Sequence, residues 1–532
     1  MIHLKKDETK TMVAVHGWSG ILLGLLLYAV VLTGTAAVFA HEIGAWSAGH
    51  VTTQSAFEKP IDATVRRLAA LTPAKYQDDV NVFEIGDHGL GVFFHRHDVD
   101  AKGKPAERGI YYQLDNQGRI LRSVEGLDED VFGPRNDDAL SSFLVDTHVR
   151  LHLPNPWGLL LTGILGLAML VAAISGLLIH RHLFKDIFTL RTRANPVLAN
   201  RDKHSVAGTW SLPFAFILAF TGSFFSFFGT IGVPVVAMAA FSGDIEALSE
   251  AVFGNPGTVD ARPVAIGNLD RVSADAVRRV GEAPTFMAIE HFGRADSKIT
   301  VFHNPKTSDI EPVVLVYEGA SANFIQAKPS VGTRPSVGGT LTGIMGPLHF
   351  GNFAGMLSKA IWFALGFAMC YVTFTGMRLW LVRRMDEKGS FAWLERTLTV
   401  VGFGLPLALT VSAAAFLITM PLGSSVYWTP AGFLIASALV ILLSIVAPSN
   451  AMLSWTIRAA TGALMLLLPL LRLLAAGGPG WGEAMAVGQP VIVALDIAFL
   501  LVGGWLVREC WRERRPTRTP EPTLDRVIEA RS

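Results

Sequence analysis

Histidine is the residue type whose number and spacing in this chain suggest metal or haem chemistry. The sequence holds 15 histidines but only two cysteines, with no CxxC and no iron–sulfur spacing, so imidazole is its abundant metal ligand. One frame occurs twice, a histidine followed four residues later by glycine and 17 residues later by Thr-Gly; it starts at His16 and again at His204. A histidine at one depth in two apolar segments predicts a buried imidazole pair.

A second pair of histidines repeats near the opposite ends of two other apolar segments. His148 precedes Ser175-Gly176 by 27 residues, and His349 precedes Thr375-Gly376 by 26. Two tiers of imidazole at opposite membrane faces fit two b-type haems, because iron held between two histidines keeps the same ligands in both redox states. We therefore predict two haem b groups, with His16 and His204 at one face and His148 and His349 at the other.

Further residues near the tiers leave the ligand assignment open. His180, at the inner end of its segment, competes with His16 and His204. His152 follows His148 by one helical turn, so one of the two could bind iron while the other contacts a substrate or a haem propionate. Arg150, Arg181 and Arg201 lie beside the tiers, where a guanidinium could pair with a propionate or simply face the lipid headgroups. No catalytic residue can be assigned.

The composition predicts an α-helical polytopic membrane protein. Of the 532 residues, 51% are hydrophobic and 17% charged, and the net charge of +1 argues against a nucleic-acid partner. Apolar runs long enough to span a bilayer recur along the chain. The eight predicted spans are about 13–40, 155–180, 206–240, 354–382, 398–420, 429–447, 451–476 and 488–507.

The polar segments between the spans set the predicted topology. Basic residues follow the second span and fill the C-terminal tail, so both termini are expected in the cytoplasm. Each long polar segment reads as a helix followed by strands, which predicts two α+β periplasmic domains. The predicted divisions are 1–44 with the first span, 45–147 and 243–345 for the two domains, 148–242 with spans two and three, 346–385 with span four, 386–510 with four extra spans, and 511–532 as a basic tail.

The first two thirds of the chain therefore read as two helix–domain–helix repeats that form a four-helix bundle around the haems. Repeats of this kind usually create a site where the copies meet. In the extra block, Arg472 and Asp496 lie at similar depths on adjacent spans. Two charges inside a membrane are costly alone, so we predict that they form an ion pair.

Several short motifs resemble the PepSY-associated transmembrane family. They are His16-x-Trp-x-Gly, Asp146-Thr-His148, Ser175-Gly-Leu-Leu-Ile-His180, Asp202-Lys-His204 and Leu348-His349-Phe-Gly. The resemblance covers about residues 1–385 and implies a bacterial inner-membrane protein with two PepSY-like periplasmic domains and two b haems. It also implies, for some members, a ferric-siderophore reductase for iron uptake that acts on the periplasmic side.

The leading functional hypothesis is a haem oxidoreductase that carries electrons across the inner membrane to a ferric siderophore or another periplasmic ferric chelate. No dinucleotide or flavin signature is visible, so a separate cytoplasmic reductase or a membrane quinol must supply the electrons. Two alternatives remain open. One is a transporter, although charged residues are scarce in the first four spans, and the other is a PepSY-based peptide-binding or regulatory protein, which leaves the histidine tiers unexplained.

Overall fold

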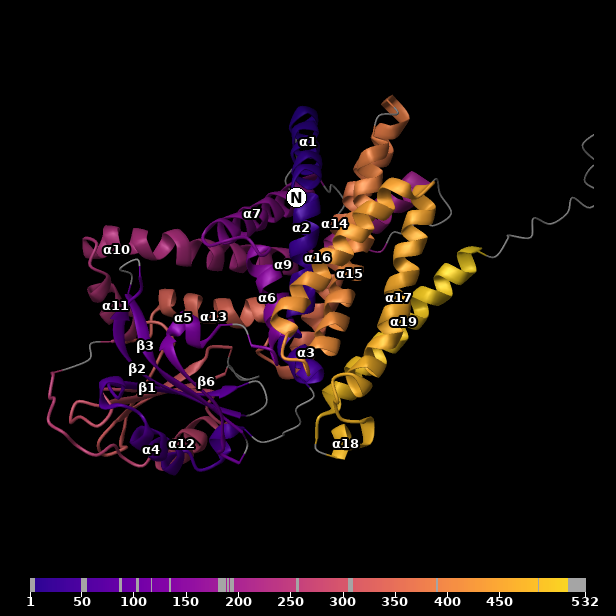
Figure 1. Cartoon of the computed structure of the whole chain (residues 1–532). Helices are drawn as coiled ribbons and strands as arrows, with labels where there is room; N and C mark the ends of the chain where they lie inside the picture. Colours follow the sequence, from indigo (N-terminus) through magenta and orange to yellow (C-terminus); the bar gives the residue numbers. More distant parts are fainter. Residues whose placement is uncertain are drawn as a thin grey trace, which may run out of the picture.

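The computed structural model places a layer of long helices above a single β-sheet (Figure 1). It describes residues 5–48, 55–85, 89–101, 105–115, 117–133, 135–179, 188, 191, 196–254, 258–304, 310–388, 391–486 and 488–514. We call the side on which the sheet lies the outer side, and the opposite side the inner side.

The helices of the two repeats follow one order. The first repeat contributes α1 (Lys6–Leu22), α2 (Gly24–Ala37), α3 (Ala40–Ala48), α6 (Ala139–Arg150) and α7 (Trp157–Ile179). The second contributes α9 (Pro196–Phe227), a π-helical turn (Phe228–Gly232), α10 (Val233–Phe241), α11 (Ile245–Phe253), α13 (Val337–Phe350) and α14 (Gly355–Lys388). The extra block contributes α15 (Ala392–Thr419), α16 (Ser425–Val446), α17 (Asn450–Leu474), α18 (Trp481–Ala486) and α19 (Pro490–Arg514).

The long helices make this a multi-pass membrane protein. Within the described residues, seven helices are long and apolar enough to cross a membrane, and α1 with α2 makes an eighth if the bent pair is one span. The sequence predicted one first helix over about 13–40, but the structure divides it into α1 and α2, which are bent by 67° next to Leu23. Gly20 and Gly24 flank this bend, and glycine weakens a helix interior because it carries the largest loss of backbone entropy.

The outer histidines, predicted near the ends of apolar segments, lie on separate short helices that precede the long spans. His148 is on α6, which ends at Leu151 in the left-handed conformation (φ 51°) before α7 starts. His349 is on α13, which ends at Gly351 (φ 66°) before α14 starts. In both repeats a short helix therefore precedes the returning span and carries the outer histidine.

The two polar segments together form one antiparallel eight-stranded sheet of order β4-β3-β2-β1-β5-β6-β7-β8. The first segment supplies β1 (Asp79–Ile85), β2 (Gly89–Val99), β3 (Pro105–Leu114) and β4 (Ile120–Leu127). The second supplies β5 (Phe286–Glu290), β6 (Lys298–His303), β7 (Val313–Glu318) and β8 (Phe324–Lys328), the last of which the sequence did not reveal. Antiparallel pairing of β1 with β5, from Val80 opposite Ile289 to Phe83 opposite Phe286, joins the halves.

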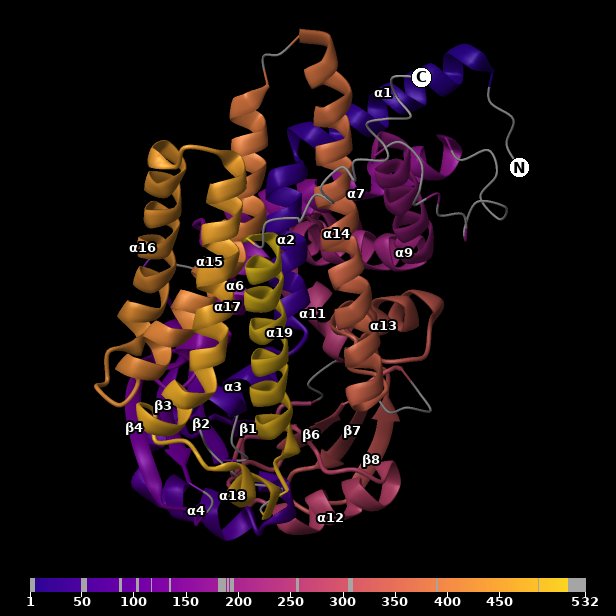
Figure 2. The same ribbon diagram turned by 90° about the vertical axis from the view of Figure 1, so that its right-hand side faces the viewer.

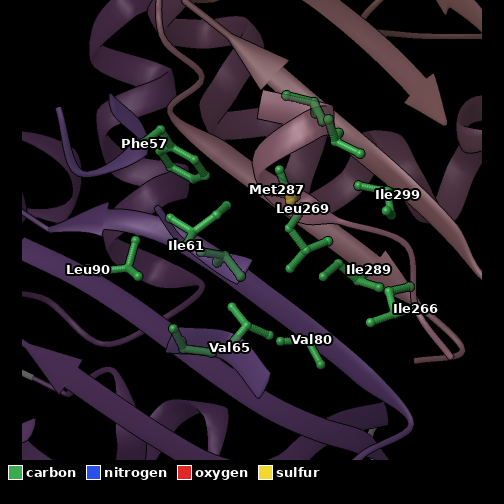
Figure 3. Close-up of a cluster of buried hydrophobic side chains, with 14 of the residues drawn as sticks. Phe57, Ile61, Val65, Val80, Leu90, Ile266, Leu269, Met287, Ile289 and Ile299 are labelled. Carbon is green, nitrogen blue, oxygen red and sulfur yellow. The ribbon is translucent and has the colours of Figure 1, made fainter. Parts of the chain in front are cut away.

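Helices α4 (Asp62–Leu71) and α12 (Leu269–Val280) cover the face of the sheet that points away from the membrane bundle (Figure 1). Alternate strand residues point to this face because the side-chain period of a strand is two. Figure 3 shows the resulting core, in which Ile61 just before α4, Val65 of α4, Leu269 of α12 and strand residues such as Val80 and Ile289 meet. Two short turns, Ala56–Glu58 and Ala74–Tyr76, and α5 (Asp128–Val131) complete the first half.

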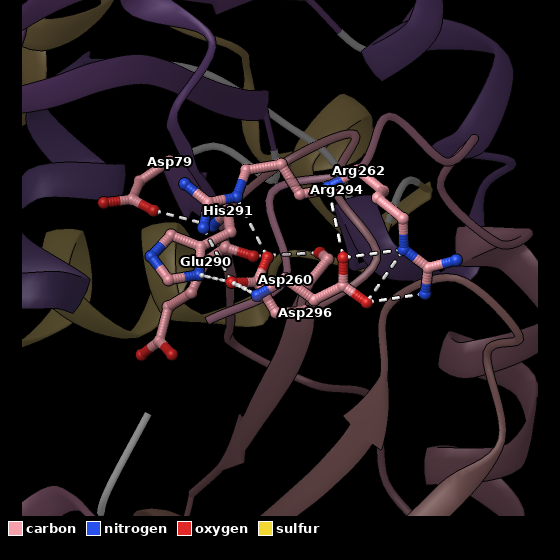
Figure 4. Close-up of polar contacts among 8 residues, drawn as sticks. Asp79, Asp260, Arg262, Glu290, His291, Arg294 and Asp296 are labelled. Carbon is pink, nitrogen blue, oxygen red and sulfur yellow. Dashed lines mark hydrogen bonds and ion pairs between the residues drawn. The ribbon is translucent and has the colours of Figure 1, made fainter. Parts of the chain in front are cut away.

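Polar contacts fix the two halves to each other at the centre of the sheet. Asp270 accepts the backbone N–H groups of Ile61 (2.6 Å) and Asp62 (3.1 Å), and Asp62 accepts that of Leu269 (3.0 Å), so each helix caps the start of the other. Asp79 of β1 accepts the backbone N–H of His291 just after β5 at 2.9 Å, within the network drawn in Figure 4.

The extra block packs beside the bundle, against α2, α3 and α6 of the first repeat and α14 of the second (Figure 2). The predicted pair forms, with Nη2 of Arg472 2.7 Å from Oδ2 of Asp496 and both side chains 1% exposed. Asp496 also accepts the indole N–H of Trp46 on α3 at 2.7 Å and that of Trp481 on α18 at 2.8 Å. The carboxylate thus ties α3, which precedes the first polar segment, to the C-terminal helices.

Candidate functional site

The inner pair consists of His16 on α1 and His204 on α9. Their ring centroids lie 6.2 Å apart, with an angle of 64° between the ring planes. Both rings are half-buried. The repeated frame that singled out these two residues in the sequence thus brings them together, edge to face, on the inner side of the bundle.

The outer pair consists of His148 on α6 and His349 on α13. The ring centroids are 6.1 Å apart and the ring planes differ by 25°. Phe225 packs on His349 at 5.6 Å, and Phe350 at 5.5 Å, so one side of the pair is aromatic. The two helices belong to different repeats, and the pair therefore lies at the interface between them.

Each of the four histidines points Nδ1 at the helix that carries a Ser-Gly or Thr-Gly dipeptide in its own repeat. The contacts are His16 Nδ1 to Ala172 O (2.9 Å) and Ser175 Oγ (3.3 Å), His204 Nδ1 to Val372 O (3.1 Å) and Thr375 Oγ1 (3.4 Å), His148 Nδ1 to Val30 O (2.9 Å), and His349 Nδ1 to Thr221 Oγ1 (2.9 Å). We call the segment that anchors each ring, with its Ser-Gly or Thr-Gly dipeptide, the cradle of that histidine. All four cradles thus hold Nδ1 of their ring in a similar way.

These contacts fix the tautomer. A carbonyl oxygen can only accept, so Nδ1 of His16, His148 and His204 carries the proton. The hydroxyl of Thr221 already donates to Ile217 O at 2.7 Å, so it accepts from Nδ1 of His349 as well. Every ring therefore keeps the lone pair on Nε2, which is the form in which imidazole binds a metal.

The glycine of each dipeptide makes room for the ring. A Cβ placed on Gly34 would lie 2.6 Å from Cε1 of His148, and one on Gly376 would lie 2.9 Å from Cε1 of His204. The corresponding distances are 3.2 Å for Gly176 to His16 and for Gly222 to His349. The close approach at these four glycines is therefore to the imidazole rings.

The spacing within both pairs fits one metal ion between two imidazoles. A bond from a first-row metal to an imidazole nitrogen is about 2 Å, so two such bonds plus the depth of the two rings give centroids roughly 6 Å apart. The observed separations are 6.2 and 6.1 Å. The donor set, two neutral imidazoles with anchored Nδ1, is that of a six-coordinate haem.

The inner pair opens into a cavity of about 550 Å³ between α1, α7, α9 and α14. Its walls are mostly apolar and include Trp18 and Trp380, whose rings pack edge to face at 5.9 Å. Lys10 and Arg201 supply positive charge to the lining. An apolar slot with cationic groups suits a flat ring that carries carboxylates.

Helix α9 sets the distance between the two tiers. It carries His204 of the inner pair and, 17 residues later, Thr221, which anchors His349 of the outer pair. At 1.5 Å per residue this spacing is about 25 Å. This length is close to the thickness of the hydrocarbon core of a bilayer, about 30 Å.

The other sequence-predicted candidates lie elsewhere. His152 turns away from the outer pair: Nδ1 is 2.8 Å from Asp146 Oδ2 and Nε2 is 2.7 Å from Thr147 Oγ1, so neither nitrogen is left for iron. Arg150 pairs with Asp146 on its own helix. His180 and Arg181 lie outside the described residues.

His95 and His97, two residues apart on β2, contact polar side chains of the sheet domain. His95 is 3% exposed, and its Nε2 is 3.0 Å from Asn81, while His97 Nε2 is 3.5 Å from Asp79. Burial, and next the charge of His97, lower the pKa of His95 to about 4. Among the described residues no three His, Cys, Asp or Glu side chains are placed to share a metal ion.

The site and the fold define a multi-pass membrane protein with two anchored histidine pairs between two repeats. The protein-family model described as the PepSY-associated TM region matches residues 13–383 of the sequence, and the chain belongs to that family. The chain is also similar to an uncharacterized protein of Pseudomonas aeruginosa, with 24% identity over 396 residues that cover 71% of this chain and 96% of the relative. The extra block, α15 to α19, lies outside the family match.

Proposed function

We propose that this protein is a b-type haem oxidoreductase of the bacterial inner membrane that carries electrons outward and reduces a ferric chelate, such as a ferric siderophore, in the periplasm. The observation that supports it most is the repetition of one cradle at four histidines, with both rings of each pair facing one another at 6.1 to 6.2 Å. Solvent-exposed or packing histidines have no reason to share tautomer, anchor and partner distance.

Haem b bound at each pair would supply a one-electron carrier whose iron keeps its ligands in both oxidation states. The chain's own contribution is to hold those ligands still. The carbonyl groups of Ala172, Val372 and Val30 and the hydroxyl of Thr221 fix the ring orientations. The apolar walls of the inner cavity keep water away and so limit reorganisation when charge moves.

The direction follows from the side on which the sheet lies. The sheet domain covers the outer pair, and a periplasmic sheet places that pair nearest a soluble acceptor. The inner pair then faces the cytoplasm, where a separate reductase or a membrane quinol would donate electrons. Cytoplasmic termini complete this orientation, which agrees with the basic residues of the C-terminal tail.

The first test is an optical spectrum of the purified protein with a haem count. We expect a reduced b-type band and about two haems per chain, with the count falling to about one in His16→Ala, His204→Ala, His148→Ala and His349→Ala. His97→Ala is the matched control, because its side chain is 80% exposed and lies on the sheet. A colourless wild-type protein would refute the proposal and favour a peptide-binding or regulatory role.

The second test concerns direction. In vesicles with the sheet domain outside, a membrane-impermeant ferric chelate added externally should reoxidise both reduced haems. His349→Ala should abolish this reoxidation while the inner haem remains reducible, because the outer carrier is lost. Equal reoxidation rates in the wild type and in His349→Ala would contradict a path through the outer pair.

A further inference from the structure

A cavity of about 700 Å³ lies on the outer side between the membrane bundle and the first half of the sheet. Helices α3 and α6 form one wall, and β2, β3 and the segment before α6 form the other. Asp146 and Val149 of α6 line the cavity, and His148 of the outer pair is on the same helix. A helix with its side chains is about 10 Å across, so the cavity and the outer pair are separated by one helix.

The polar lining of this cavity has an excess of negative charge. Four carboxylates line it, those of Asp115, Asp137, Asp138 and Asp146. Three guanidinium groups pair with them: Arg119 with Asp115, Arg150 with Asp146, and Arg135 with both Asp137 and Asp138. The four carboxylates and the three guanidinium groups together carry a net charge of −1. His41 of α3, an exposed side chain, also lines the cavity.

The extra block fixes both walls of this cavity. Trp46 on α3 donates its indole N–H to Asp496, which is buried among α17, α18 and α19. On the other wall, the hydroxyl of Ser425 at the start of α16 donates to the backbone carbonyl oxygen of Asn136 at 2.6 Å. Asn136 lies in the sequence between Arg135 and Asp137, which both line the cavity. Phe143 of α6 packs on Phe433 of α16 at 5.5 Å. None of these contacts reaches the histidine pairs directly.

We infer that this cavity binds the electron acceptor, that it favours a ferric chelate with net positive charge, and that helices α15 to α19 hold its shape. The size is that of a small-molecule site, and its mixed lining offers four carboxylates and the guanidinium group of Arg135 to a polar complex. This inference rests on the proposed function for the identity of the ligand. It adds the place of binding, the charge class, and a task for the block that lies outside the family match.

Binding can be measured apart from electron transfer with gallium(III) chelates, because gallium(III) is not reduced under conditions that reduce iron(III). The probes are a gallium hydroxamate complex that bears a free ammonium group and a gallium catecholate complex with net negative charge. We expect the full-length protein in detergent to bind the cationic complex more tightly by calorimetry. Asp137→Asn should weaken that binding by about fivefold, the effect of one unit charge at contact distance in a largely aqueous setting.

Ser425→Ala tests the role of the extra block. It removes the contact with Asn136 and should weaken binding of the cationic complex while the haem spectrum and the haem count stay unchanged. Glu58→Gln, an exposed carboxylate next to a short turn elsewhere on the sheet domain, is the matched control and should bind as the wild type does. If Asp137→Asn does not fold, His41→Ala at the opposite wall provides the same measurement of binding at this cavity.

The outcomes separate this inference from the proposed function. A colourless protein that binds the gallium complexes with the stated charge preference and loses affinity in Asp137→Asn would support the cavity and refute the haem function. A protein with two haems that binds both complexes equally, or whose affinity is the same in Asp137→Asn and Ser425→Ala as in the wild type, would overturn the cavity inference.

Discussion

Replacing Gly34 by alanine tests the cradle geometry directly. The added Cβ would lie 2.6 Å from Cε1 and 2.8 Å from Nδ1 of His148. Carbon atoms in contact prefer about 3.5 Å or more, so the imidazole must retreat by about 1 Å. The retreat also stretches the 2.9 Å hydrogen bond from Nδ1 to Val30.

The expected loss is large because metal sites tolerate little displacement. Metal–ligand distances vary by only about 0.2 Å in well-formed sites. Disturbing a ligand's supporting hydrogen bond typically lowers metal affinity by about 10- to 100-fold. Overpacking a tight contact costs about 1–3 kcal/mol of stability in addition. We therefore expect Gly34→Ala to lose the outer haem and to keep the inner one.

The four cradles predict a graded series. The Cβ contacts shorten from 3.2 Å at Gly176 and Gly222 to 2.9 Å at Gly376 and 2.6 Å at Gly34. The defect should follow that order, with the inner haem affected at Gly176 and Gly376 and the outer haem at Gly34 and Gly222. Gly504→Ala on α19 is the control, because a Cβ at Gly504 has no atom within 4 Å and α19 does not line the inner cavity.

Haem content by optical spectroscopy and thermal unfolding of each purified variant are the assays. Wild-type haem content in Gly34→Ala would refute the cradle argument, since a Cβ cannot share that space with the ring. The same conclusion would follow if Gly504→Ala lost haem to the same degree as Gly34→Ala, because the effect would then belong to helix substitution in general.

Three further outcomes are expected. Asp496→Asn leaves Arg472 buried without its counter-charge and should cost about 3–5 kcal/mol in thermal or denaturant unfolding; a stable variant with reduced turnover would instead indicate a functional role for the pair. Acidification should destabilise the sheet domain between pH 6.5 and about 4, because folded His95 stays neutral in this range while the same residue in the unfolded chain takes up a proton. With a folded pKa of about 4, the free energy of unfolding falls by about 3 kcal/mol over this range. His95→Gln should remove this pH dependence of unfolding. Asp270→Ala removes the cap from the start of α4 and should lower the unfolding free energy by about 1 kcal/mol, whereas unchanged stability would show that the cross-capping is not needed.

The family match ends before the extra block begins at α15. Its contacts with the first repeat are specific: Tyr28 of α2 donates to Gly402 O of α15 at 2.8 Å, besides the bonds made by Trp46 and Ser425. A variant that lacks α15 to α19 would expose these partners and the apolar faces of α2 and α6. Point substitutions at the contacts are therefore better probes of its role than truncation.

The sequence by itself determined the approximate limits of the seven unbroken spans, the helix-then-strand order of both polar segments and the two tiers of histidine. These features depend on signals written along the chain, namely apolar run length, strand alternation and the repeated spacing of His, Ser or Thr, and Gly. It also indicated the Arg472–Asp496 pair, because two isolated charges at one membrane depth have few other ways to be stabilised.

Only the tertiary structure decided which atoms meet. The anchor of His16 lies 156 residues away at Ala172, and that of His148 lies 118 residues away at Val30, so no local pattern could reveal that Nδ1 is used in each case. The same holds for the pairing of β1 with β5 into one sheet, for the cavity above it, and for Trp46 bonding to Asp496 across 450 residues. Such contacts depend on how whole helices and strands pack, and packing is set by the sum of many surfaces rather than by the residues of any one segment.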